Sequence, residues 1–154
     1  MDGRHSMTRG GRWNAPGSFP VVYTNCSIDV AIVNLWRQFR SEVGQPWEVA
    51  EEKQADLYEI DLDQPGLIDV VSPGGIAGIG LPAAYPDAAP RSLTQRIGRR
   101  LHQERRPGVW CISAALRSGR EIALFTDYCA PGTVRRPPKR LREWFPVPDE
   151  WKTP

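Results

Sequence analysis

Residues 10–24 read GGRWNAPGSFPVVYT, and the interpretation of the rest of the chain depends on this stretch. The paired glycines and the proline–glycine dipeptide indicate two turns, because glycine adopts backbone angles that other residues resist. Arg12, Trp13 and Asn14 stand between these turns, and residues 20–24 follow as a short apolar strand. An arginine on such a loop suits phosphate or carboxylate, because its guanidinium presents a rigid fork of donors. The local sequence fits a solvated Arg12 on a surface hairpin equally well.

Composition excludes several classes of protein. The 154-residue chain is long enough for one domain with a core, and its net charge of +2 does not by itself imply a nucleic-acid partner. No apolar run approaches ~20 residues and the N-terminus is polar, so we expect no membrane span and no signal peptide. Three cysteines without CxxC spacing fit reduced thiols better than disulfides or a zinc site. His5 and His102 are too few histidines for most triads or metal sites.

The periodicity of apolar residues predicts a single α+β domain. Residues 27–43 carry apolar side chains at helical spacing behind a capping serine, and residues 57–62 alternate like a half-buried strand. Strands and helices follow no regular βαβ alternation, which favours the α+β class. We expect residues 1–9 to be poorly ordered, residues 72–86 to form a loop, strands over 20–24, 57–62, 67–71, 109–115 and 121–125, and helices over 27–43 and 92–104.

Two basic segments and a glycine-rich segment suggest contacts with ligands or partners. The helix predicted over 92–104 opens with the capping box Ser92-Leu93-Thr94-Gln95, and its arginines either form a solvated face or bind an acidic partner. The tail from Cys129 is basic and proline-rich and cannot continue the sheet of the domain, so we expect it to wrap the surface or to serve as a docking arm. The glycines of residues 74–80 do not make a nucleotide P-loop, because no GK[ST] ending follows them.

Four segments, taken in order, resemble the RES domain family, which is named for an arginine, a glutamate and a serine. They are GGRWN at 10–14, VYT at 22–24, Ala31-x-x-Asn34 in the first predicted helix and CISAA at 111–115. The resemblance covers the domain expected over residues 10–126. Composition indicates a flexible N-terminus over residues 1–9 and a proline-rich basic arm over residues 127–154. It implies an ADP-ribosyltransferase-like mixed sheet with flanking helices, in a toxin of a bacterial toxin–antitoxin pair.

The resemblance further implies that the protein binds NAD and cleaves its nicotinamide–ribose bond by hydrolysis, phosphorolysis or ADP-ribosyl transfer. Matched position by position, Arg12 holds the NAD phosphates and Tyr23 positions the nicotinamide, with Trp13 and Asn14 in the same cofactor-binding loop. Ser113 orients the nicotinamide ribose or its carboxamide, and no metal takes part. The expected partner is an Xre-type antitoxin that covers the cleft of a cytoplasmic toxin. Nucleic acid is met only through that antitoxin, and self-association is left open.

Asn34 stands where the family pattern has its glutamate, so Asn34 and Ser113 are the expected catalytic positions. A carboxylate there would stabilise an oxocarbenium-like transition state, whereas asparagine can hold a hydroxyl but carries no charge and cannot act as a base. Glu51, Glu59 and Glu121 are the candidates to supply the charge instead. The alternative is a catalytically weakened module that binds NAD or ADP-ribose and acts through its basic segments. A nucleic-acid-binding domain is a third hypothesis.

Overall fold

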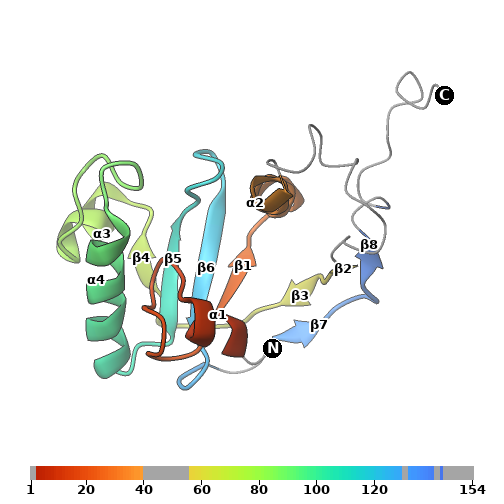
Figure 1. Cartoon of the computed structure of the whole chain (residues 1–154), viewed down its shortest axis with the longest axis horizontal. Helices are drawn as coiled ribbons and strands as arrows, with labels where there is room; N and C mark the ends of the chain where they lie inside the picture. The colour runs from red at the N-terminus through yellow and green to blue at the C-terminus, as the bar shows by residue number, and fades with distance from the viewer. Residues whose placement is uncertain (1–2, 40–55, 130–131, 141–142, 144–154) are drawn as a thin grey trace.

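A four-stranded mixed sheet forms the centre of this computed structural model (Figure 1). The structure describes residues 3–39, 56–129, 132–140 and 143. The sheet contains, in spatial order, β1 (Val21–Asn25), β6 (Arg120–Phe125), β5 (Gly108–Ile112) and β4 (Ile68–Val70). β6 runs antiparallel to both of its neighbours, and β4 runs parallel to β5. The α+β class and the mixed sheet are therefore confirmed.

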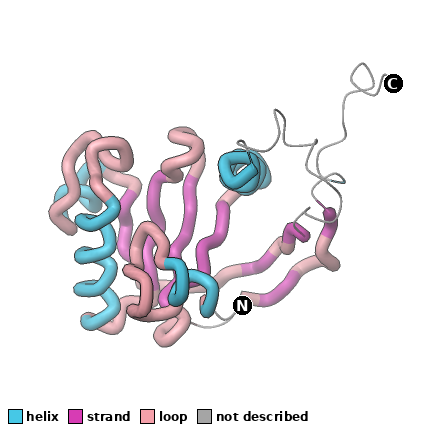
Figure 2. Tube along the Cα trace, viewed as in Figure 1, coloured by secondary structure: helices cyan, strands magenta, loops and turns pink. Residues whose placement is uncertain are grey.

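Helices flank the sheet, as Figure 2 shows. α1 (Arg4–Arg9) and the loop after it lie across one face of the sheet, and α2 (Ile28–Phe39) follows the end of β1. α3 (Pro73–Gly78) and α4 (Arg91–Gln103) lie on the side of β4 and β5. The buried apolar core lies between the sheet, the N-terminal loop and these helices, and its largest members are Trp13, Phe19, Tyr85 and Phe125.

The local predictions for the main sheet and for α2 are confirmed. β1, β4, β5 and β6 lie within or beside the predicted segments, although β5 ends one residue before Ser113. The amide of Val30 lies 3.4 Å from Ser27 Oγ, consistent with the predicted cap of α2. Positions 40–43 of the predicted helix lie outside the described residues. The described cysteines, Cys26, Cys111 and Cys129, are all free thiols.

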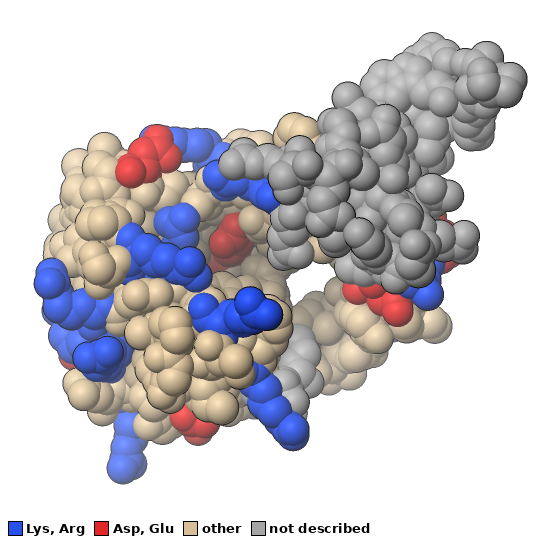
Figure 3. All heavy atoms as spheres, viewed as in Figure 1, with Lys and Arg blue, Asp and Glu red and all other residues tan. Residues whose placement is uncertain are grey.

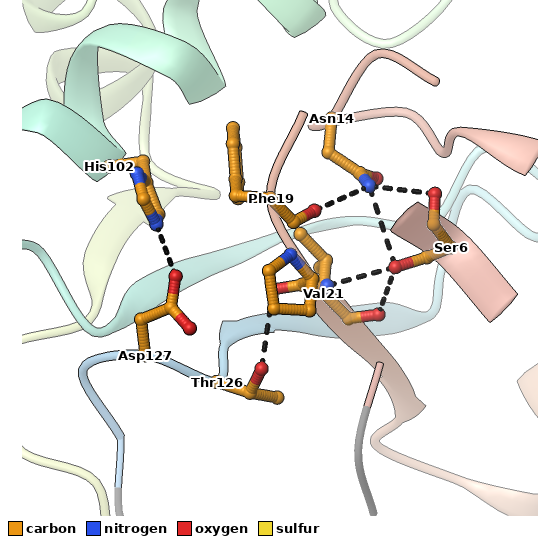
Figure 4. Close-up of polar contacts among 8 residues, drawn as sticks. Ser6, Asn14, Phe19, Val21, His102, Thr126 and Asp127 are labelled. Atoms are coloured by element: carbon orange, nitrogen blue, oxygen red, sulfur yellow. Dashed lines mark hydrogen bonds and ion pairs between the residues drawn. The ribbon is translucent and has the colours of Figure 1, made fainter. Parts of the chain in front are cut away.

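The expectation of a poorly ordered N-terminus is wrong for residues 4–9, because these residues form α1 and the buried Ser6 ties α1 to β1 (Figure 4). The Ser6 hydroxyl donates to the carbonyl of Val21 at 2.5 Å and accepts the Val21 amide at 2.8 Å. The amide group of Asn14 donates to the carbonyls of Ser6 and Phe19, at 2.9 and 3.0 Å. Polar composition suggested disorder, but these polar groups satisfy one another in the interior.

The expectation of a loop over 72–86 is wrong in its first part, which contains α3. Ser72 caps this helix by accepting the Gly75 amide at 3.0 Å, Pro73 occupies the first turn, and Ile76 is buried. Proline is compatible with a first helical turn because its missing donor has no partner there anyway. The Ser72 cap and the burial of Ile76 therefore stabilise a short helix that consists mostly of small residues.

The predicted capping box at 92–95 is also wrong, because α4 begins at Arg91 behind Pro90 and has no side-chain cap. The Gln95 amide donates instead to the carbonyls of Gly11 and Asn14, at 2.9 and 3.2 Å. A glutamine in a capping box would turn back to its own helix. Here α4 uses its first turns to hold the loop that carries Arg12.

Two short antiparallel ribbons extend from the β1 side of the molecule (Figure 1). They pair β2 (Asp56–Leu57) with β8 (Lys139–Arg140), and β3 (Ile60–Asp61) with β7 (Thr133–Val134). The single strand predicted over 57–62 is therefore wrong, since two separate two-residue strands form outside the main sheet. Alternation predicts a half-buried strand but cannot tell which segment pairs with it.

Opposite charges hold the ribbons together. Arg135 pairs with Asp61 at 2.9 Å and with Glu59 at 3.3 Å, and Arg136 also reaches Glu59 at 3.3 Å. Arg140 pairs with Asp56 at 3.2 Å. The described part of the basic tail thus pairs with the chain itself. Within the described ranges, no helix combines the length and the hydrophobicity needed to cross a bilayer.

Candidate functional site

A cleft of about 530 Å³ lies between the N-terminal loop, the ends of β1 and β6, and α2. In Figure 3, lysine and arginine atoms surround a hollow on the visible face, and acidic atoms lie within it. The polar side chains that line this cleft include His5, Arg12, Tyr23, Asn25, Asn34, Asp56, Arg91 and Glu121. The structure therefore brings together three of the residues predicted from sequence, Arg12, Tyr23 and Asn34.

The loop that carries Arg12 is held rigidly against α4. Thr94 Oγ1 donates to the Arg12 carbonyl at 2.7 Å, and a Cβ on Gly98 would lie only 1.8 Å from the Trp13 carbonyl oxygen. Helix and loop therefore approach too closely for any side chain at position 98. The backbone of Arg12 is fixed. The residue is half-buried, its side chain lies near Tyr85, and it forms no ion pair with the acids that the structure describes.

Tyr23 is locked in place by the same loop. Its hydroxyl donates to Asn14 Oδ1 and accepts the amide of Trp13, both at 2.9 Å. A Cβ on Gly11 would lie 2.2 Å from that hydroxyl, so only glycine lets the ring pack here. Burial raises the pKa of the Tyr23 hydroxyl, which stays neutral at physiological pH. Tyr23 thus presents a fixed aromatic ring to the cleft.

Trp13 and Asn14, which the resemblance places in the cofactor-binding loop, are fully buried and do not line the cleft. Trp13 packs in the core with its ring centroid 6.3 Å from that of Tyr85. Asn14 directs its amide inward to Ser6 and Phe19 and its oxygen to Tyr23. Both side chains therefore shape the loop from beneath and do not line the cleft. The GGRWN motif at residues 10–14 therefore contains residues that pack in the interior. A sequence motif alone does not distinguish such residues from those that contact a ligand.

Glu121 joins Ser113 and Asn34 into one network. Ser113 Oγ donates to Glu121 Oε1 at 2.6 Å, and Asn34 Nδ2 donates to the same oxygen at 2.9 Å. Asn34 Nδ2 also donates to Asn25 Oδ1 at 2.8 Å. Asn25 and Glu121 are cross-strand partners on β1 and β6, so the sheet register sets this arrangement.

Ser113, which the resemblance places at the nicotinamide end of a ligand, is fully buried in the structure. Besides donating to Glu121, its hydroxyl oxygen accepts the amides of Ala115 and Leu116, both at 3.1 Å. These bonds occupy the hydroxyl completely. Ser113 therefore supports the Glu121 carboxylate. Glu121 lines the cleft, whereas Ser113 does not.

The domain model named RES domain matches residues 1–147. The chain belongs to the RES domain family. A crystal structure described as the M. tuberculosis MbcT-MbcA toxin-antitoxin complex has a similar fold, with a TM-score of 0.72 and 24% sequence identity. The alignment covers 92% of this chain and 76% of the other. No curated protein sequence matches the chain.

The sequence alone does not identify two of the residues that line the cleft of this RES domain, Arg91 and Glu121. Arg91 donates from Nε to the Gly11 carbonyl at 3.1 Å and from Nη2 to the Gly10 carbonyl at 3.2 Å. Nothing in the sequence distinguishes Arg91 from the other arginines of α4. Glu121 was one of three candidate acids; Glu59 lies in the ribbons, and Glu51 lies outside the described residues.

The functional groups that line the cleft of this RES domain follow a definite order along it. Glu121 and its donors lie at the end of β1, Tyr23 lies two residues back along the strand, and the arginine-bearing loop lies beyond the Tyr23 hydroxyl. Two residues of strand span ~7 Å. Carboxylate, aromatic ring and guanidinium groups therefore follow one another along the cleft. No cluster of side chains suited to a metal ion occurs among the residues described.

Proposed function

We propose that the protein is a NAD-consuming toxin of a toxin–antitoxin pair that cleaves the nicotinamide–ribose bond. The observation that carries this proposal is the order of Glu121, Tyr23 and Arg12 along one cleft. NAD joins a cationic nicotinamide riboside to a diphosphate, so one end favours a carboxylate and an aromatic ring and the other favours guanidinium groups. Membership of the RES domain family supports the same proposal.

Arg12 and Arg91 are the proposed diphosphate-binding pair. Both line the cleft, and the bonds of Arg91 to the Gly10 and Gly11 carbonyls link its position to the loop that carries Arg12. A prearranged pair costs less side-chain entropy on binding than two mobile arginines. Tyr23 packs against the nicotinamide ring, and its fixed hydroxyl prevents the phenol from swinging away.

The proposed partner is a cognate antitoxin of the Xre type that covers this cleft in the cytoplasm, and nucleic acid is reached only through it. Support comes from the fold, since the similar M. tuberculosis structure is described as a toxin–antitoxin complex. An antitoxin segment that enters the cleft would meet Arg12 and Arg91, so its contact surface should carry acidic groups.

The test is NAD consumption by the purified protein, followed by chromatography of nicotinamide and ADP-ribose. Arg12→Ala removes charge-assisted contacts worth about 1.5–3 kcal/mol, so affinity for ADP-ribose should fall by roughly 10- to 100-fold. Arg117→Ala is the matched control, because Arg117 pairs with Asp87 on the surface and does not line the cleft. Induced wild-type protein should arrest growth with falling cellular NAD, whereas Arg12→Ala should not.

A binding module without turnover is the alternative, and Asn34 is the observation that favours it. It predicts normal affinity for NAD or ADP-ribose and no release of nicotinamide by the wild type. Measured nicotinamide release that depends on Arg12 would exclude this alternative. Unchanged cellular NAD and normal growth on induction would exclude the toxin.

A further inference from the structure

We infer that Glu121 is the catalytic carboxylate of this cleft and that Asn34 and Ser113 are positioning residues that aim it. This inference rests on the proposed function and adds the identity of the reacting group. Of the acids that line the cleft, Asp56 is paired with Arg140 at 3.2 Å, whereas Glu121 forms no ion pair with any described residue. Glu121 is therefore the carboxylate whose charge is available to a ligand.

The two oxygens of Glu121 have different surroundings. Oε1 accepts both the Ser113 hydroxyl and the Asn34 amide, at 2.6 and 2.9 Å. Oε2 accepts no hydrogen bond from the residues that the structure describes, and Glu121 lines the cleft. One oxygen is thus held and the other is left to the ligand. A carboxylate accepts hydrogen bonds only, so Oε2 suits a ribose hydroxyl or a water molecule.

The donors of Glu121 are themselves fixed by different elements of the fold. Ser113 is fully buried and held by two amides of the turn after β5, while Asn34 projects from α2. Glu121 comes from β6, between the other two strands of the network. Three elements therefore converge on one carboxylate oxygen. Such prearrangement is what electrostatic stabilisation of a transition state needs.

The chemical step balances with water as the acceptor. The bond between C1′ of the ribose and the nicotinamide nitrogen breaks, and the bonding electron pair leaves with nicotinamide, which becomes neutral. The positive charge that develops on the ribose is stabilised by the Glu121 carboxylate. Water attacks C1′ and gives up a proton, which Glu121 Oε2 accepts and passes to solvent. The products are ADP-ribose, nicotinamide and one proton.

Asn34 does not replace a missing acid in this arrangement. Its Nδ2 bridges Asn25 Oδ1 and Glu121 Oε1, at 2.8 and 2.9 Å, so a neutral donor is what the position requires. A carboxylate at position 34 would face a second carboxylate at hydrogen-bond distance, which like-charge repulsion opposes. Asparagine at this position and glutamate at position 121 are therefore complementary.

The first experiment compares wild type, Glu121→Gln and the exchanged variant Asn34→Glu/Glu121→Gln in steady-state NAD cleavage. Glu121→Gln keeps the shape and removes the charge, so kcat should fall roughly 100- to 1,000-fold while KM stays within about threefold. The exchanged variant restores a carboxylate–amide pair in the opposite order and should regain at least about tenfold in kcat. Asp127→Asn is the control, because Asp127 bonds to His102 away from the cleft.

The second experiment tests positioning with a double-mutant cycle. Asn34→Ala should lower kcat in the wild type but cause no further loss in Glu121→Gln, because Asn34 acts through the charge of Glu121. Losses that simply multiply would overturn the positioning role. Binding of ADP-ribose and thermal unfolding, measured for each variant, identify any that fail to fold, and the exchanged variant then carries the test.

The outcomes separate the two proposals. Cleavage of NAD by the wild type and by Glu121→Gln at similar kcat would overturn the role of Glu121 and leave the proposed function standing. Absence of cleavage by a wild type that binds ADP-ribose would overturn the proposed function and this inference together. Loss of kcat in Glu121→Gln, with ADP-ribose affinity unchanged and activity regained on exchange, supports the inference.

Discussion

Replacing Gly98 with alanine tests the contact on which the cleft depends. In most helices this change stabilises the protein by roughly 0.5–1 kcal/mol, because alanine is the better helix former. Here the added Cβ would lie 1.8 Å from the Trp13 carbonyl oxygen and 2.8 Å from its carbonyl carbon, whereas ordinary contact begins at 3.4 Å. Helix α4 and the loop would have to separate by about 1.5 Å to relieve the overlap.

That separation would break the hydrogen bonds between α4 and the loop. Thr94 Oγ1 to Arg12, and Gln95 Nε2 to Gly11 and to Asn14, now measure 2.7, 2.9 and 3.2 Å. Three bonds at about 1 kcal/mol each, less the gain in helix propensity, give a net loss of about 2 kcal/mol. For a chain of this size the melting temperature should fall by roughly 4–8 °C. Affinity for ADP-ribose should fall as well, because Arg12 moves with the loop.

The assays are urea unfolding and calorimetric titration with ADP-ribose. Gly78→Ala is the matched control, because Gly78 also lies in a helix and a Cβ there would meet no atom within 4 Å. We expect Gly78→Ala to be as stable as the wild type or slightly more stable. A Gly98→Ala protein with wild-type stability and affinity would refute the close approach and the rigidity of the Arg12 loop derived from it.

Three further predictions concern the folded state. Asn14→Ala removes three buried hydrogen bonds, to the carbonyls of Ser6 and Phe19 and from the Tyr23 hydroxyl, so the free energy of unfolding should drop by about 3 kcal/mol in urea titrations; a drop under 0.5 kcal/mol would contradict the buried network. Ser92→Ala should leave the melting temperature within about 1–2 °C of wild type, because Ser92 caps nothing, whereas a true N-cap would be worth ~1 kcal/mol. Burial raises the pKa of the Cys111 thiol from 9.0 to about 12. The neutral thiol therefore makes its full contribution to stability below pH 9, and that contribution is lost as the pH rises towards 12. The free energy of unfolding should therefore decline by up to about 1.4 kcal/mol per pH unit above 9, less steeply in Cys111→Ala; equal slopes in the two proteins would refute this assignment.

The main sheet could be predicted because its strands are recognisable locally. β1 contains a short run of β-branched and aromatic residues, β6 contains the apolar run Ile122–Phe125, and β5 begins at Gly108 directly after Pro107. The segments that were predicted wrongly have their decisive partners far along the chain. Residues 56–61 pair with the tail, and α1 is stabilised by a buried serine that reaches a strand. Local periodicity contains no information about such partners.

The candidate site divides in the same way. The family pattern located Arg12, Tyr23 and Asn34, and all three line the cleft. The family pattern does not distinguish residues that line a cleft from residues that support it, and Trp13, Asn14 and Ser113 are buried beneath the surface of the cleft. Glu121 could not be preferred to Glu59, because only the register between β1 and β6 places it opposite Asn25.

One wall of the cleft pairs with a strand that is synthesised much later. Asp56 and Leu57 line the cleft, yet the strand that pairs with them is Lys139–Arg140, more than 80 residues later. Domains form as the chain leaves the ribosome, at about 5–20 residues per second, so this part of the wall waits several seconds for its partner. The sheet and the Arg12 loop are complete once Phe125 has emerged. A nascent chain therefore holds a cleft that is open on this side until Lys139–Arg140 pairs with Asp56–Leu57.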